Sequence, residues 1–553
     1  MLKGVCAIVM ARTYEETIFE ATEDAINDAL SQPVLPSPDE IKGNILDNSR
    51  NSVTMYNSIA QQGAKWKVPT ELASFQVAEI LLRLHKVALI ETGAVENDSD
   101  KLLLGIYMDD GDNEGLYVTL ESEIRRIARQ YKRSLNRREV TEIIDILREE
   151  SPRVKRCEDA NLVPVNNGVF NRTTKQLEPF SSNRVFLSKS RVNYNPNAKN
   201  IVIHNNDDNT DWDVESWMLE IADNDKDVAN LLWQVCGAAI RPYTSWNCAC
   251  FMYSEKGNNG KGTLCAMIRN VVGEGSYTSI PLADFSKDFM LEPLVSVSAI
   301  IVDENDVGTY IDKAANMKAI ITSDVIQINR KFKAPISYKF RGFMIQCLNE
   351  YPKVKDKSDS FYRRQLFIPF TKCFTGAERR YIKYDYLYRK EVLEYVLYRV
   401  LHMDYDEFDV PDVCKTALEE YKEFNDPVRT FMKEIMPQLQ WDFVPFAFIK
   451  DLYNAWYKKN VSSSKDGMKS TVVLTKDVLN LLQEYPDWVC EGKDVPQRPK
   501  GRMDKPEWLI DEYKLEDWYS KTYKGNDLSK KCCPSLKTTY KGITRVIAVG
   551  DDE

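Results

Sequence analysis

The sequence predicts an α/β protein whose parallel strands end in polar residues. Three observations predict this fold. Residues 251–269 (FMYSEKGNNGKGTLCAMIR) pass from an apolar strand through a Gly/Asn-rich turn into an amphipathic helix. A second apolar run ends in two acids at 295–304, and a third ends in an asparagine at 342–349. Because the carboxyl ends of parallel strands emerge at one edge of a sheet, these polar turns are expected to meet.

The Gly/Asn-rich turn has the composition of a phosphate-binding loop. Gly257 and Gly260 can adopt backbone angles barred to other residues, which lets successive N–H groups face a polyphosphate. Lys261 would reach the outer phosphates, and the following helix would add its positive N-terminal end. The predicted nucleotide-binding residues are Gly257, Asn258, Asn259, Gly260, Lys261, Gly262 and Thr263.

The loop departs from the pattern G-x-x-x-x-G-K-[ST] at two positions. Glu255 stands where the first glycine belongs, and Gly262 stands where the hydroxyl belongs, so Thr263 comes one position late. Mg²⁺ on the β- and γ-phosphates ordinarily takes that hydroxyl as a ligand, so Thr263 or a water molecule must replace it. On the loop alone, the alternative is a surface turn rich in glycine and asparagine.

The residues after the next two strands complete a nucleotide-hydrolysing site. Asp303 could hold Mg²⁺ directly or through water, and Glu304 could polarise the water that attacks the γ-phosphate. The neutral amide of Asn349 could hold that water. An Asp-Glu turn is common by itself, but its place downstream of Lys261 makes it the predicted partner of the loop.

Size and composition exclude several classes of protein. A chain of 553 residues with 43% hydrophobic content is expected to form about three to five domains. No apolar run approaches a membrane span, and residues 4–11 are too short for a signal peptide, so we expect an intracellular protein. The three histidines are far apart and the twelve cysteines show no C-x-x-C spacing, which predicts reduced cysteines and no zinc site.

The charge distribution is uneven. A net charge of −9 argues against a protein that coats nucleic acid over its whole surface. Residues 318–364, however, hold eleven basic and four acidic residues. Lys331 and Lys333 flank Phe332 in this stretch, a combination that can grip phosphates and stack bases. The alternative for these two lysines is a solvated basic turn.

Changes in composition divide the chain into five predicted segments. These are an N-terminal arm (1–65), a mostly helical module (66–205), an ATPase domain (206–375), a helical lid (376–425) and a C-terminal domain (426–553). Within them we expect one helix and a loose tether in the arm, further helices over 71–91, 120–131, 140–149 and 211–240, and hairpins over 161–194.

The C-terminal domain is predicted to bind DNA. Two helices, over 446–459 and 474–484, precede a proline- and charge-rich stretch and a final strand over 543–549. Residues 521–545 hold seven basic residues and one acid. Helices with a basic hairpin favour a winged-helix fold, and the alternative is a helical protein-interaction domain with a solvated face.

One family carries these motifs in the same order. The set GNNGKGT, IIVDEN, MKAIITSD, NRKFKAP, MIQCLNEYP and FYRRQLFIPF resembles the superfamily 3 helicase domain of phage, plasmid and poxvirus-type primase-helicases. NLVPVNNGVF and the helical block before it are similar to the N-terminal module of that family, so the resemblance covers roughly residues 70–425. It implies an AAA+-like P-loop ATPase core, ATP and Mg²⁺ as cofactors, and a hexameric ring around DNA. Only about seventy residues come before it, so we expect the helicase part without a primase domain.

The resemblance also implies a role for each site residue. Lys261 would bind the β- and γ-phosphates, Asp303 would hold Mg²⁺, Glu304 would be the catalytic base and Asn349 would sense the water. Lys331 and Lys333 look like the family's hairpin that grips single-stranded DNA inside the ring.

A further role implied by the resemblance acts between subunits. Arg363 or Arg364 would reach into the neighbouring subunit as an arginine finger. Arg364 is favoured because it immediately precedes the last apolar strand.

The function implied is that of a replicative helicase of a phage or other mobile element, in the cytoplasm of a bacterial host. Its expected partners are single-stranded and forked DNA, origin double-stranded DNA through the C-terminal domain, and a separate primase or polymerase, without any membrane. Two alternatives stay open: a nucleic-acid packaging ATPase, and an origin-binding or loader protein that ATP switches without hydrolysis.

Overall fold

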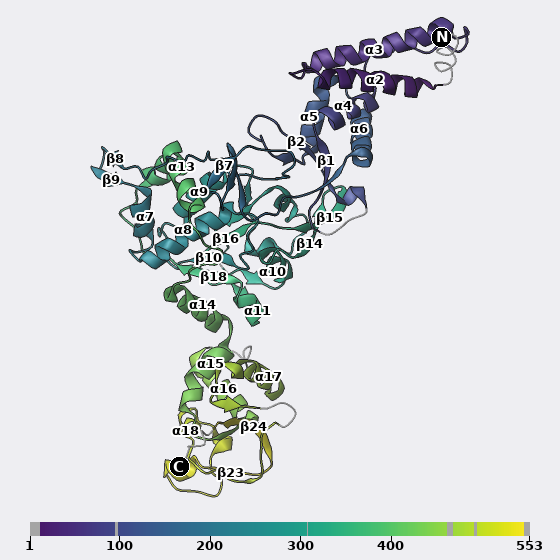
Figure 1. The fold of residues 1–553 in the computed structure, drawn as a ribbon. Helices are drawn as coiled ribbons and strands as arrows, with labels where there is room; N and C mark the ends of the chain where they lie inside the picture. The colour runs from purple at the N-terminus through teal and green to yellow at the C-terminus, as the bar shows by residue number, and fades with distance from the viewer. Residues whose placement is uncertain (1–11, 94–97, 307, 462–467, 491–494, 547–553) are drawn as a thin grey trace, which may run out of the picture. The chain divides into compact units, whose positions relative to one another are not determined.

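The computed structural model describes residues 12–93, 98–306, 308–461, 468–490 and 495–546. It contains both helices and strands, arranged in two compact units, Met1–Lys415 and Thr416–Glu553 (Figure 1). None of the helices built from these residues is both long enough and apolar enough to cross a bilayer.

The first unit begins with two antiparallel helices. α2 (Tyr14–Leu30) and α3 (Pro38–Ile59) lie side by side and share a hydrophobic core with α4 (Ser74–Leu84). Gln76 of α4 donates hydrogen bonds to hydroxyls of both helices, at 2.8 and 3.2 Å. The predicted loose tether after Leu30 is therefore wrong. Pro38 occupies the first turn of α3, where its missing N–H costs nothing, so it starts a helix instead of breaking one.

A small α/β module follows. Its four-stranded sheet has the order β3-β2-β1-β4, with α5 and α6 packed against it. The predicted helix over 71–91 ends at Leu84, because Lys86 has a φ of 50° and residues 87–91 form β1 instead. The predicted helices over 120–131 and 140–149 are confirmed. The bounds are β1 Val87–Glu91, β2 Leu103–Tyr107, β3 Tyr117–Val118, α5 Glu121–Tyr131, α6 Arg137–Glu150 and β4 Arg153–Lys155.

The hairpins predicted for residues 161–194 are present as a three-stranded antiparallel sheet. A short hairpin and two helices then lead to the central sheet. The helix predicted for 211–240 is confirmed as α7 and α8, whereas the hairpin that includes residues 211–212 was not predicted. The bounds are β5 Leu162–Val165, β6 Gly168–Asn171, β7 Gln176–Glu178, β8 Ile203–Asn205, β9 Thr210–Trp212, α7 Val214–Ile221 and α8 Lys226–Ile240.

The central sheet has five parallel strands in the order β11-β12-β16-β10-β18. Almost all of their residues are buried, as expected where both faces of a parallel sheet are covered. α8, α9 and α13 pack on one face in a single core. The bounds are β10 Ala249–Tyr253, α9 Lys261–Val272, β11 Tyr277–Thr278, β12 Ala299–Val302, β16 Phe343–Leu348, β18 Gln365–Pro369 and α13 Lys390–Leu401.

The predicted strand over 295–302 starts only at Ala299, because residues 292–296 form a 3₁₀ turn. Smaller elements lie between and after the central strands. They are β13 Tyr310–Ile311, α10 Ala315–Ile321, β14 Val325–Arg330, β15 Lys333–Lys339, β17 Lys353–Val354, α11 Asp359–Tyr362, α12 Arg380–Tyr384 and α14 Asp412–Asn425.

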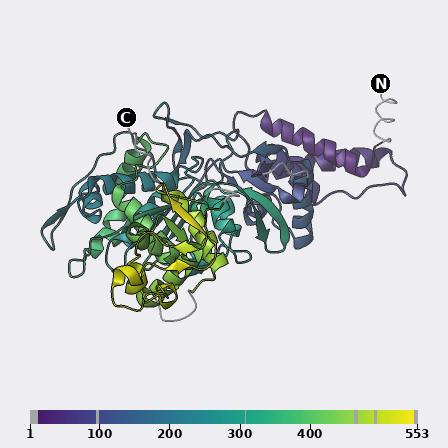
Figure 2. The ribbon, with the colours of Figure 1, turned by 90° about the horizontal axis from the view of Figure 1, so that it is seen from below.

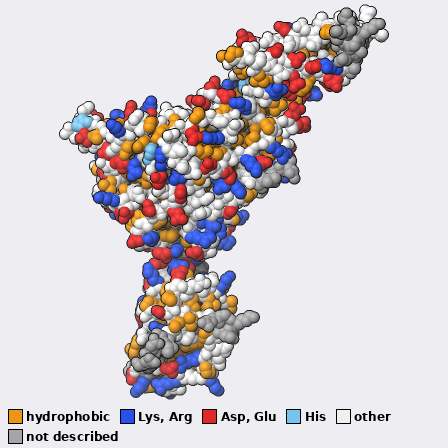
Figure 3. Space-filling view, viewed as in Figure 1, with side chains coloured by type: hydrophobic (Ala, Val, Ile, Leu, Met, Phe, Trp, Pro, Cys, Tyr) orange, Lys and Arg blue, Asp and Glu red, His pale blue; other side chains and the backbone are white. Residues whose placement is uncertain are grey.

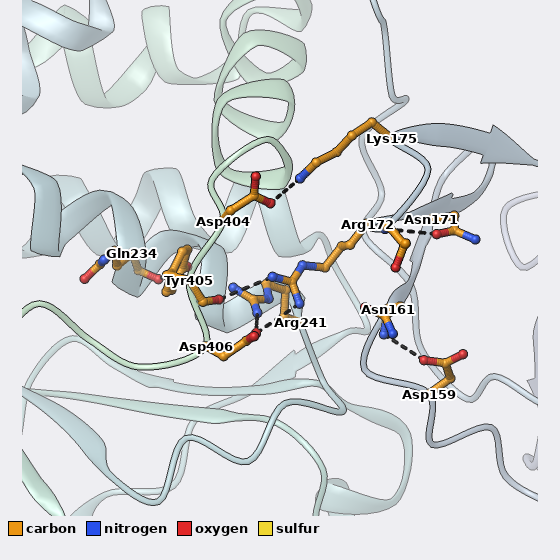
Figure 4. Close-up of polar contacts among 11 residues, drawn as sticks. Asp159, Asn161, Asn171, Arg172, Lys175, Gln234, Arg241, Asp404, Tyr405 and Asp406 are labelled. Atoms are coloured by element: carbon orange, nitrogen blue, oxygen red, sulfur yellow. Dashed lines mark hydrogen bonds and ion pairs between the residues drawn. The ribbon is translucent and has the colours of Figure 1, made fainter.

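A buried arginine fastens the three-stranded sheet to the core. Arg241, at the C-terminal end of α8, is 1% exposed and its guanidinium lies over the rings of Trp246 and Tyr405, at 4.7 and 4.6 Å. Arg241 and Arg172, from the β6–β7 turn, both contact Asp406, at 2.8 and 3.2 Å (Figure 4). Three segments that are distant in sequence therefore meet where two arginines share one aspartate beside two aromatic rings.

Replacing Arg241 by alanine is expected to destabilise the first unit by about 2–4 kcal/mol, because it removes a side chain packed between two rings. The measurement is the urea transition of this unit, followed by far-UV circular dichroism. Asp406→Asn is the matched control and should cost under about 1 kcal/mol, since that carboxylate is largely exposed. If both variants lost the same free energy of unfolding, the ion pair with Asp406 would be the stabilising contact, and not the packing of Arg241 between the rings.

The second unit combines helices with a small antiparallel sheet. Its leading elements follow the order helix, strand, helix, helix, strand, and β24 lies between β19 and β20. The two predicted helices are confirmed, and the predicted last strand is β24, with 547–549 outside the described residues. The main bounds are α15 Pro427–Ile435, β19 Phe443–Pro445, α16 Phe446–Asn460, α17 Thr471–Leu481, β20 Trp488–Val489 and β24 Tyr540–Arg545.

The surface mixes both signs of charge. Acidic and basic side chains are interspersed over the face shown in Figure 3. Many basic residues predicted as a local excess are paired: Lys318 with Asp356, Arg341 with Glu158. Acids from elsewhere in the first unit, which pair with Lys333, Arg341 and Lys355, therefore offset part of the basic excess of residues 318–364.

Candidate active site

The Gly/Asn-rich loop joins the carboxyl end of β10 to the first residue of α9. Two of its residues, Asn258 and Gly260, have left-handed φ angles of 54° and 88°. Asn259 between them is buried, donates to the carbonyl of Lys256 and accepts from the N–H of Lys261 at 3.3 Å. This side chain holds the loop from within. A glycine-rich loop before a helix has the backbone composition of an anion-binding site.

Lys261 is buried at the end of the loop. Its ammonium donates to the carbonyls of Ser254 and Leu348, at 3.2 and 3.0 Å, and to Asn349 Oδ1 at 3.0 Å. Burial lowers the pKa of this ammonium, and the nearby Asp303 carboxylate opposes the shift. The predicted phosphate-binding lysine and the predicted water-sensing asparagine are thus in direct contact, although they are 88 residues apart in sequence.

The turn after β12 presents two acids at the same edge of the sheet. Asp303 is half-buried and Glu304 is exposed. The turn is fixed by Asn305, whose amide donates to Gln346 Oε1 and to the Cys347 carbonyl, both at 3.0 Å. Sequence reasoning missed this positioning role, although the amide that directly follows the two acids was visible.

Gly262 explains the departure of the loop from the expected pattern. A Cβ added at Gly262 would lie 2.9 Å from Asp303 Oδ1, which is closer than such atoms approach. The Asp303 carboxylate therefore lies against the position where the usual hydroxyl side chain would begin. Thr263, one residue later, still lines the same cavity.

All the residues predicted for the nucleotide site, except the two arginines, line one cavity of about 710 Å³: the seven of the loop, Asp303, Glu304 and Asn349. The cavity is also lined by Arg379, Arg380 and Lys383, which follow β18 and which sequence reasoning did not select. This segment is attached to the loop, because the Phe374 N–H donates to the Asn258 carbonyl at 2.7 Å. The sequence feature that could have indicated this segment is its run of basic residues, which lies within the predicted helical lid.

Arg363 and Arg364 lie at the opposite edge of the sheet. The Arg364 carbonyl accepts a hydrogen bond from the N–H of Ala249, which is the first residue of β10. The Gly/Asn-rich loop begins at the other end of this strand, after its last residue. A strand of five residues spans roughly 16 Å, so neither arginine reaches the cavity of its own chain. Arg363 is exposed, while Arg364 is half-buried and donates to the Ser360 carbonyl.

The two lysines predicted to bind DNA lie on a β-hairpin, as expected. β14 and β15 pair antiparallel, and Phe332 at the tip is 95% exposed with a φ of 61°. Lys331 lies over the Phe332 ring at 5.4 Å, whereas Lys333 pairs with Glu121 of α5 at 2.7 Å. The hairpin, teal in Figure 2, rests against the N-terminal α/β module. The tip thus presents an aromatic ring and one basic side chain.

Comparison with known proteins locates two family regions. Residues 55–221 match the family described as D5 N terminal like. Residues 252–364, from the β10 strand to Arg364, match a family of unknown function (DUF5906). No curated protein matches the chain. The first match supports a relationship to phage-type primase-helicases. The second contains all ten of the predicted residues that line the cavity but assigns them no activity.

Solved structures give weaker likenesses. They include the A form apo structure of the NrS-1 C terminal region, at 14% identity and a TM-score of 0.40, covering 74% of this chain and 86% of that one. Another apo structure of the same region is 13% identical at the same TM-score, covering 75% and 90%. A TM-score this low supports no inference about this chain.

Proposed function

We propose that this chain is an ATP-dependent DNA helicase with an AAA+-like P-loop core, which assembles as a hexamer and hydrolyses ATP between subunits. The observation that carries the proposal is the convergence of the loop, two acids and an asparagine in one cavity at the carboxyl edge of a parallel sheet. The loop strand β10 lies between two strands that come later in the chain, which is where ligands bind in open α/β sheets.

The residues of the cavity suit Mg²⁺ with a polyphosphate. Carboxylate, hydroxyl and phosphate oxygens are the ligands that this hard cation prefers. Asp303 and Thr263 would hold it, and the closeness of Asp303 to Gly262 puts a carboxylate oxygen beside the place of the missing hydroxyl. When bound, Mg²⁺ would neutralise charge on the phosphates.

The polar contacts of the cavity suggest how the protein groups act. ATP phosphates would draw the Lys261 ammonium away from its three oxygen partners and onto the nucleotide. Asn349 would then be released to orient the attacking water. Glu304, exposed in the cavity, would accept a proton from that water as it attacks the γ-phosphate.

The arginines at the far edge support action between subunits. A residue that cannot reach its own cavity can serve a neighbour's, and such a trans charge makes hydrolysis depend on assembly. We assign the finger to Arg363, since its side chain is exposed, whereas the guanidinium of Arg364 is turned back to Ser360.

The order of helices and strands in the second unit supports a winged-helix fold as part of the proposal, in which α17 would be the recognition helix. Several basic residues near its end are already engaged, such as Lys531 over the Tyr519 ring and Arg545 over Trp488. Binding of origin DNA by this unit is part of the proposal.

Restoring the usual hydroxyl should impair the enzyme. Gly262→Ser is expected to lower the rate of ATP hydrolysis about 10²-fold, because its Cβ displaces Asp303 and misplaced groups at a reacting centre cost that much. Phosphate release measures the effect. Gly262→Ala is the matched control and should lose as much, since the contact arises at Cβ; higher activity with serine than with wild-type glycine would contradict the account.

Removing both hairpin lysines should weaken single-strand binding. Lys331→Ala with Lys333→Ala is expected to reduce the log–log salt slope of DNA affinity by about 0.7 per lost phosphate contact. Fluorescence anisotropy with a labelled oligonucleotide measures the slope. Lys65→Ala with Lys67→Ala is a matched control, because those exposed lysines also flank an aromatic residue. If the salt slope of DNA affinity were the same in both double variants, the hairpin lysines would not contact the DNA phosphates.

A forked DNA substrate tests the proposed activity. The helicase proposal predicts strand separation that requires ATP hydrolysis. Hydrolysis without strand separation would favour the packaging ATPase, and tight ATP binding without phosphate release would favour the ATP-switched loader.

A further inference from the structure

Two cysteines that are distant in sequence meet directly beneath the candidate active site. Cys265 lies on α9, one turn after Lys261, and Cys347 lies on β16, two residues before Asn349. Their Sγ atoms are 3.3 Å apart, and both residues are buried. Among the described residues, a carboxylate oxygen of Asp303 and these two sulfurs form a set in which every atom lies within 4.8 Å of the others.

The set has the composition of a site for a thiophilic cation. Thiolates select Zn²⁺ and its heavier relatives, whereas Mg²⁺ prefers oxygen alone. Tetrahedral Zn²⁺ with bonds to sulfur of about 2.3 Å places two thiolate sulfurs about 3.8 Å apart, so the observed pair needs only a small widening. Three protein ligands leave a fourth position for water or another ligand, and Asp303 is the member of the set that lines the cavity.

The surrounding charges suit an anionic ligand set. Two thiolates and one carboxylate around a divalent cation leave one excess negative charge. The Arg269 guanidinium lies 3.7 Å from Asp303, and the Lys261 ammonium is the next cation at the base of the cavity. These two groups can balance the excess charge without any other rearrangement of the fold.

We infer that Cys265, Cys347 and Asp303 form a binding site for a thiophilic divalent cation, with Zn²⁺ or Cd²⁺ as the ligand. Binding forms two metal–sulfur bonds and one metal–oxygen bond and releases two thiol protons to solvent. A consequence rests on the proposed function: Asp303 cannot serve the soft cation and Mg²⁺ at once, so the soft cation would stop ATP hydrolysis.

The test is a titration of the full nucleotide-free chain with Cd²⁺, followed by the ultraviolet charge-transfer band of cadmium thiolate. We expect a saturable component at one Cd²⁺ per chain that Cys265→Ala and Cys347→Ala each abolish. Asp303→Asn should weaken it at least about tenfold. Cys236→Ala and Cys250→Ala are matched controls, since these cysteines are also buried in the same core but lie outside the set, and they should keep the component.

A measurement on the wild-type chain covers the case in which an alanine variant fails to fold. X-ray absorption at the zinc edge of the one-to-one complex should show two sulfur ligands at about 2.3 Å together with oxygen. A shell without sulfur, or a cadmium band unchanged in the Cys265→Ala, Cys347→Ala double variant, would overturn the inference. If the band behaves as expected but protein free of cadmium and zinc, supplied with Mg²⁺, never hydrolyses ATP, the cation site stands and the proposed function fails.

Discussion

Glu304→Gln is expected to bind ATP with unchanged affinity while its phosphate release falls by about 10²–10⁴, the usual contribution of a general base. The amide keeps the shape of the side chain but cannot accept the proton of the attacking water. Because the loop and Lys261 would hold ATP in the proposed function, binding and assembly should persist. Single-turnover phosphate release, together with a fluorescent-nucleotide titration, separates the two quantities.

The matched control for this variant is Glu350→Gln. Glu350 follows the neighbouring strand, is exposed, and accepts from the N–H of Gly308 without lining the cavity. It should hydrolyse ATP at the wild-type rate. If Glu304→Gln unwound forked DNA normally, Glu304 would not be the base.

Arg363→Ala is expected to lower the turnover of assembled protein by about 10³–10⁵, the range measured for arginine fingers in GTPases. Arg364→Ala is the matched comparison at the adjacent position and should lose far less activity, since that side chain is bonded within its own chain. If Arg364→Ala lost more activity than Arg363→Ala, Arg364 would be the arginine finger.

Mixing experiments test whether the finger acts between subunits. Arg363→Ala protein is combined with Lys261→Ala protein, each inactive alone. A mixed ring contains interfaces with an intact loop from one subunit and an intact arginine from the next, so activity should partly return. Mixtures that stay inactive, although the subunits co-assemble, would show that the arginine serves its own chain.

The sequence predicted much of the site because strand ends are local signals. An apolar run followed by polar residues indicates where a strand ends. In a parallel sheet the carboxyl ends of the strands lie at the same edge, so the polar residues that follow them are close together. For this reason the sequence alone places Lys261, Asp303 and Asn349 in one group. The hairpin around Phe332 was expected only from the resemblance to the helicase family.

Other features depend on contacts between distant segments. The helix α3 was missed because its proline-rich start was read as a tether, and its burial depends on α2 and α4. The pairing of Lys333 with Glu121, 212 residues away, removes one of two predicted DNA contacts in the free protein. The Cys265–Cys347 contact spans 82 residues with no spacing signal, so a search for metal motifs in the sequence could not find it.

The glycine at position 262 also shows that the sequence alone does not reveal contacts between distant segments. In the sequence, Gly262 is only a position that lacks the usual hydroxyl. In the structure it is the space that lets Asp303 approach α9, so the loop and the acid compensate for each other.

The measurement that most directly tests the central claim is phosphate release by the purified wild-type chain with ATP and Mg²⁺, with and without single-stranded DNA. The account predicts ATP hydrolysis that rises when DNA is added and when protein concentration favours assembly. Absence of phosphate release under both conditions, with ATP shown to be bound, would contradict it.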